Sequence, residues 1–88
     1  MEADIAVLGV CGLDADFGLS SDDFAESQMK RAMSQAAARI IVVTDAAKVG
    51  QRARHQTLAP DEIDLVVSNA TGPAAADLRE AGILMADL

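Results

Sequence analysis

Two short apolar runs constrain the fold of this chain more than any other feature of its sequence. Residues 5–10 contain no polar side chain, and residues 40–44 are β-branched throughout. A strand that is apolar on both of its faces is typical of a parallel sheet covered from above and below. The chain between these two runs carries a helical pattern, so the sequence predicts a β-α-β unit.

The helix is predicted at residues 22–38, where small and apolar side chains recur at spacings of three and four. They are Ala25, Met29, Ala32, Met33, Ala36 and Ile40. Asp23 and Glu26 have the spacing of a capping box at the start of this helix. Glu26 and Lys30 form an i, i+4 pair on its polar side. We therefore expect the apolar side to pack on the sheet and the polar side to face solvent.

Two further strands are predicted at residues 64–68 and 83–86, with a second helix at residues 73–80 between them. Pro73 suits the first helical position, and Gly82 suits the stop. The rest of the chain is expected to be irregular: residues 11–21 and 45–50 as loops, residues 51–58 as a polar and basic connection, and residues 60–62 as a turn. This order of elements predicts an α/β fold, with a mostly parallel sheet flanked by helices in one domain.

Charge and cysteine content exclude several classes of function. The net charge is −7, which argues against direct binding to nucleic acid, because phosphate backbones are held mainly by Lys and Arg. Cys11 is the single cysteine, so no internal disulfide can form and a cytoplasmic location is expected. The acidic N-terminus resembles neither a signal peptide nor a membrane anchor. One histidine cannot supply a zinc site or a serine triad, and we expect no catalytic residue, metal or cofactor.

The loops after the first two strands are the candidate binding region, because parallel sheets bind ligands beyond the carboxyl ends of their strands. Lys48 lies in the second loop and could present its ammonium group to a phosphate. Four of the eight Lys, Arg and His residues fall between positions 48 and 55. These charges could attract an anion or could simply be solvated, and their spacing does not decide between the two.

The acidic side chains of the same loops have two interpretations. Asp14 and Asp16 could bind sugar hydroxyls, but aspartates in such loops are more often turn formers. Asp45 is expected to cap its own loop through a local hydrogen bond. The glycines of residues 9–18 could allow a ligand to approach the backbone, or could serve only as turn residues.

The chain resembles the C-terminal effector domain of DeoR-family transcription regulators. The resemblance is carried by residues 3–14, 18–20, 29–33, 44–50, 63–68 and 81–83. It implies the three-layer fold shared with ribose-phosphate isomerase and the CoA transferases, and it implies the sensing of a phosphorylated sugar in carbohydrate catabolism. The effector-binding residues implied are Gly12, Leu13, Asp14 and Gly18 in the glycine-rich loop, with Asp45 and Lys48 in the next. Lys48 would contact the phosphate.

The resemblance also implies a domain organisation. Residues 1–88 would form the C-terminal half of the effector-binding domain of a repressor, without the helix-turn-helix domain through which such proteins bind DNA. The missing half would leave apolar sheet surface exposed, which favours a homo-oligomer. Two alternatives stay open: a sugar-phosphate isomerase or deaminase fragment, or an inactive truncated remnant. Deaminases of this type place Asp-Gly-His where this chain has Asp14-Ala15-Asp16, which counts against the enzyme.

Overall fold

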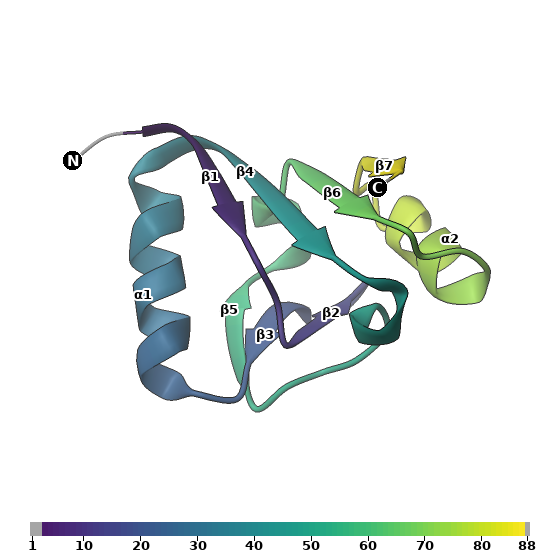
Figure 1. The fold of residues 1–88 in the computed structure, drawn as a ribbon, viewed down its shortest axis with the longest axis horizontal. Helices are drawn as coiled ribbons and strands as arrows, with labels where there is room; N and C mark the ends of the chain where they lie inside the picture. The colour runs from purple at the N-terminus through teal and green to yellow at the C-terminus, as the bar shows by residue number, and fades with distance from the viewer. Residues whose placement is uncertain (1–2, 88) are drawn as a thin grey trace.

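A four-stranded parallel sheet organises the fold (Figure 1). The computed structural model describes residues 3–87. The strand order is β1-β4-β6-β7, and each neighbouring pair is parallel: β1 is Ala3–Leu8, β4 is Ala37–Thr44, β6 is Leu65–Ser68 and β7 is Met85–Asp87. Helix α1, Phe24–Gln35, lies between β1 and β4 in the chain, and helix α2, Pro73–Glu80, lies between β6 and β7. The predicted α/β fold with a mostly parallel sheet is confirmed.

A second, smaller sheet was not predicted. It is antiparallel, in the order β2-β3-β5, and consists of Gly12–Asp14, Gly18–Ser21 and His55–Leu58. The expectation that residues 11–21 form only a loop was therefore wrong. The expectation that residues 51–58 form an irregular connection was also wrong, because they contain β5. These strands are three or four residues long, too short to show a local periodicity, and β5 pairs with β3 from a distant part of the sequence.

The core lies where the two sheets and α2 meet. Alternate residues of the parallel strands, Leu8, Val42 and Val66, point into it and are at most 2% exposed. The small sheet contributes side chains that are fully buried, Leu13, Leu19 and Leu58, and α2 contributes Leu78. The small sheet is thus held against the parallel sheet by a shared apolar cluster.

The opposite face of the parallel sheet, here called the outer face, is largely open. It carries the exposed side chains of Ile5, Val7 and Val43, with Ile41, Leu65 and Val67 partly buried beside them. The alternation along β1 and β4 separates this face from the core. An apolar sheet face without cover is an interaction surface in many proteins.

Helix α1 buries its polar side and exposes its apolar side, which is the reverse of the prediction. Asp23 caps it as expected, because its carboxylate accepts a hydrogen bond from the Glu26 amide at 3.2 Å, but the Glu26 carboxylate pairs with Lys30 instead of completing a capping box. Yet Met29 and Met33 are 58% and 45% exposed, whereas Ser27 is buried. The expectation that the apolar side packs on the sheet was wrong.

Polar contacts explain this orientation of α1. The hydroxyl of Ser27 lies 2.7 Å from that of Thr57 on β5, and both side chains are buried. Arg31 donates to the Thr57 carbonyl at 2.9 Å and to the Glu62 carboxylate at 3.3 Å. Lys30, expected on the solvent side, donates to the carbonyl of Gly9 at 2.8 Å. The hydrogen bonds of its polar side therefore tie α1 to the small sheet and to the end of β1.

Candidate functional site

A hollow of about 290 Å³ lies at the C-terminal ends of β1 and β4. This volume is just below the range of about 300–1,000 Å³ that is usual for small-ligand pockets. The lining residues follow directly from the two strand ends: Gly9, Val10, Val43, Thr44, Asp45 and Lys48. It is the position at which parallel sheets bind ligands.

Two capping interactions shape the segment that carries Lys48. The Asp45 carboxylate accepts a hydrogen bond from the Ala47 amide at 3.1 Å, the local cap expected from the sequence. Asn69, just beyond β6, accepts from the Ala46 amide at 2.8 Å. A single 3-10 turn, Ala46–Lys48, results, and it sets Lys48 at the edge of the hollow. The ends of two neighbouring strands, β4 and β6, thus fix the position of one lysine.

Lys48 is the cation that remains available to this hollow. Its side chain is exposed, and among residues 3–87 no carboxylate lies within ion-pair distance of its ammonium group. Arg52 pairs instead with Asp14 at 3.0 Å, and the ring of His55 packs edge-on against Phe24 with centroids 5.4 Å apart. The basic segment of residues 48–55 is therefore not one patch, and Lys48 is the member of it that lines the hollow.

The glycine-rich loop does not form an open cradle. Leu13 is fully buried in the core, and a Cβ atom on Gly12 would lie 2.6 Å from the Gln51 carbonyl oxygen. Gly18 is also buried, with a positive φ of 83°. The loop does lie beside the Lys48 segment, because Gly50 donates to the Leu13 carbonyl at 2.6 Å. Effector contacts by Gly12, Leu13 and Gly18 stay a prediction.

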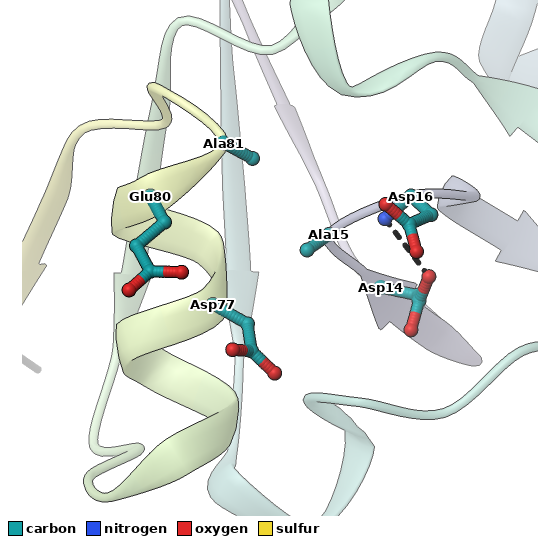
Figure 2. A pocket seen from close by; sticks show the side chains of 6 residues that line it. All are labelled: Asp14, Ala15, Asp16, Asp77, Glu80 and Ala81. Atoms are coloured by element: carbon teal, nitrogen blue, oxygen red, sulfur yellow. Dashed lines mark hydrogen bonds between the residues drawn. The ribbon is translucent and has the colours of Figure 1, made fainter.

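Asp14 lines a different hollow, of about 420 Å³, between the β2–β3 hairpin and α2 (Figure 2). Figure 2 shows the carboxylates of Asp77 and Glu80 on the helix and those of Asp14 and Asp16 on the hairpin, with Ala15 and Ala81 completing the lining. Four acidic side chains make this hollow repulsive to a phosphate. The structure therefore brings Asp45 and Lys48 together and leaves Asp14 apart from them.

The Asp14 carboxylate forms hydrogen bonds within its own turn and with Arg52. One of its oxygens accepts from the amides of Asp16 and Phe17, both at 2.9 Å, and from Arg52 at 3.1 Å. Partial burial by itself raises the pKa of Asp14, but the two amide hydrogen bonds and the Arg52 guanidinium outweigh it and lower the pKa below the usual value. Of the two interpretations of this residue, the geometry favours the turn former.

Two residues near the hollow of Lys48 were not predicted from the sequence. Asn69 directly follows an apolar strand, as Asp45 does, and this shared position could have revealed it. Lys30 gave no signal of its own, because its spacing from Glu26 is that of an ordinary surface ion pair. Only the packing of α1 brings it to Gly9.

Comparison with known proteins assigns the chain to a family. Residues 1–70 match the model of the DeoR C-terminal sensor domain. The chain belongs to this family. It is similar to the HTH-type transcriptional regulator GlpR of Haloferax volcanii, with 33% identity over 86 residues that cover 96% of this chain and 34% of the relative. It is also similar to a putative aga operon transcriptional repressor of Escherichia coli O157:H7, with 34% identity over 82 residues, 91% of this chain and 30% of the relative.

The chain spans about a third of the length of these curated relatives. Both are transcription regulators and neither is an enzyme, which supports the sensor-domain interpretation over the isomerase or deaminase. Within residues 3–87, no helix is long and apolar enough to cross a membrane.

Proposed function

We propose that this sensor domain binds a phosphorylated sugar in the hollow at the ends of β1 and β4. One observation carries the proposal: Lys48 lines that hollow without an ion-pair partner among the described residues, although the whole chain has a net charge of −7. An ammonium group beside exposed backbone at Gly9 offers a compact charge to a phosphate. The acidic hollow of Asp14 has no cationic side chain among the described residues of its lining.

The wider role follows from the family and is part of the same proposal. Residues 1–88 would be the C-terminal half of the effector-binding domain of a cytoplasmic repressor of carbohydrate catabolism. DNA would be bound only by a helix-turn-helix domain, and effector binding would alter its affinity for DNA. The open outer face supports a homo-oligomer.

Calorimetric titration with a panel of sugar phosphates and with inorganic phosphate tests the site. We expect at least one sugar phosphate to bind and Lys48→Met to weaken it about tenfold, the equivalent of roughly 1.4 kcal/mol for the loss of one charge-assisted contact. Arg54→Met is the matched control, because Arg54 is an exposed cation of the same segment that does not line the hollow.

Three results would contradict the proposal in different ways. An absence of heat for every sugar phosphate would favour the inactive remnant. Equal weakening by Lys48→Met and Arg54→Met would indicate a general charge effect rather than a site. Turnover of an amino-sugar phosphate would restore the enzyme interpretation.

A further inference from the structure

Lys30 contacts the wall of the proposed effector hollow from outside. Its ammonium nitrogen lies 2.8 Å from the carbonyl oxygen of Gly9, and Gly9 lines the hollow together with Lys48. The same ammonium pairs with Glu26 at 2.8 Å, and the side chain of Lys30 is only 13% exposed. Helix α1 is therefore joined to the end of β1 by one well-covered cation.

The bond from Lys30 to Gly9 is not needed to give a buried carbonyl group a hydrogen-bond partner. Gly9 is exposed, so water could solvate its carbonyl oxygen without any help from a side chain. Covering a lysine restricts one of the most flexible side chains, which opposes folding. The contact thus does something that solvent would not do, which is to fix the direction of the Gly9 carbonyl.

That direction determines where the next amide points. Gly9 has no side chain, and no atom lies within 4 Å of the place where its Cβ would be, so no packing around a side chain restrains this residue. In a trans peptide the carbonyl of one residue and the N–H of the next point to opposite sides. A Gly9 carbonyl held toward Lys30 therefore directs the Val10 N–H away from Lys30, and Val10 also lines the hollow.

We propose that Lys30 is a positioning residue of the effector site, which holds the Gly9–Val10 peptide so that the Val10 amide and the Lys48 ammonium meet the same anion. This inference rests on the proposed function. Lys30 acts through the backbone and does not touch the ligand. Its effect on binding is therefore separable from that of Lys48.

Titration of the ¹⁵N-labelled protein with inorganic phosphate, followed by NMR, tests this role. In the wild-type protein we expect the Val10 amide signal to move on titration. In Lys30→Met, which keeps the apolar stem, we expect the Val10 signal of the free protein to be displaced and the phosphate Kd to rise about fivefold. Glu26→Gln is the control, because it removes the ion pair but leaves the bond from Lys30 to Gly9; its Kd should stay within about twofold of wild type.

The outcomes separate this inference from the proposed function. If wild-type protein and Lys48→Met bind phosphate equally, the site itself is wrong, and the inference is wrong with it. If Lys48→Met weakens binding while Lys30→Met leaves the Kd and the Val10 signal unchanged, only the role of Lys30 is overturned. Equal losses in Lys30→Met and Glu26→Gln would mean that the ion pair acts only by holding α1, and would also overturn it.

Lys30→Arg serves if Lys30→Met does not fold. Arginine keeps the charge and can keep the pair with Glu26, but its planar guanidinium presents donors in a different geometry. We expect a displaced Val10 signal and a Kd about threefold higher. Wild-type values for both would overturn the proposal.

Discussion

Asp14 and Glu62 are single carboxylates that each hold a turn closed. Asp14 accepts the amides of Asp16 and Phe17, as described above. The Glu62 carboxylate accepts a hydrogen bond from the Ala59 amide at 2.9 Å, and this bond lowers the pKa of Glu62. Partial burial opposes the shift, and the Arg31 guanidinium adds to it. Both groups are thus more acidic in the folded chain than in the unfolded one, so folding favours their ionised forms.

Stability should therefore fall in acid. A group whose pKa is lowered by folding contributes its stability above the unfolded value and loses it as the pH falls through the folded value. The ordinary values are 4.5 for Glu62 and 3.8 for Asp14. We expect the free energy of unfolding in urea to be constant near neutral pH and to decrease progressively below pH 4.5.

Asp14→Asn should make this decrease shallower, since its side chain no longer titrates. Asp16→Asn is the control, because it makes the same change of charge in the same turn. The Asp16 side chain is 92% exposed, and its distance of 3.6 Å from Arg52 is longer than the 3.0 Å of Asp14. An acid profile of Asp14→Asn that coincides with that of wild type would show that Asp14 does not contribute to the dependence on pH.

The helices and parallel strands that show a local pattern were predicted from the sequence, whereas the short strands of the small sheet and the packing of α1 were not. The apolar runs placed the parallel strands, and the rule for strand ends placed Asp45 and Lys48 at one hollow. The helical period showed that α1 has two sides but not which side is bound, because the buried Ser27–Thr57 pair joins residues 30 positions apart. Likewise, the position of Asp14 across from α2 depends on packing, which no spacing within residues 11–21 records.

The β2–β3 hairpin should depend strongly on Gly18. This residue has a φ of 83°, and an added Cβ would clash with the Leu58 carbonyl oxygen on β5. We expect Gly18→Ala to lower the free energy of unfolding by about 3 kcal/mol, from a strained φ and a backbone clash together. Gly82→Ala is a matched control, since Gly82 has a φ of 88° but open space around it; strain alone should cost about 1 kcal/mol there. Equal losses in urea unfolding would show that the clash is relieved by movement of β5.

The attachment of α1 to β5 can be measured with a double-mutant cycle. Ser27→Ala and Thr57→Val each leave a buried hydroxyl without its partner, at a cost of about 1 kcal/mol or more. The double variant removes both hydroxyls, so its loss should be smaller than the sum of the single losses. Additive losses in chemical unfolding would mean that the two hydroxyls do not act as a pair.

For the whole molecule, the open outer face and the high net charge act in opposite directions on self-association. The exposed side chains of Ile5 and Val7 favour burial against a second copy, whereas two copies of charge −7 repel each other. Salt screens the repulsion and leaves the apolar attraction in place. Association through this face should therefore strengthen as salt is added, unlike association through ion pairs.

Sedimentation velocity over a range of protein and salt concentrations tests this expectation. We expect the weight-average mass of the wild type to rise with both, and Val7→Lys to shift the curve to higher protein concentration by about tenfold, because a charge would be buried at the interface. Thr71→Lys makes the same change in net charge at an exposed loop position and should leave the apolar face intact. If Val7→Lys and Thr71→Lys behave alike, or if salt dissociates the wild type, the copies associate through another surface and the outer face has a different role.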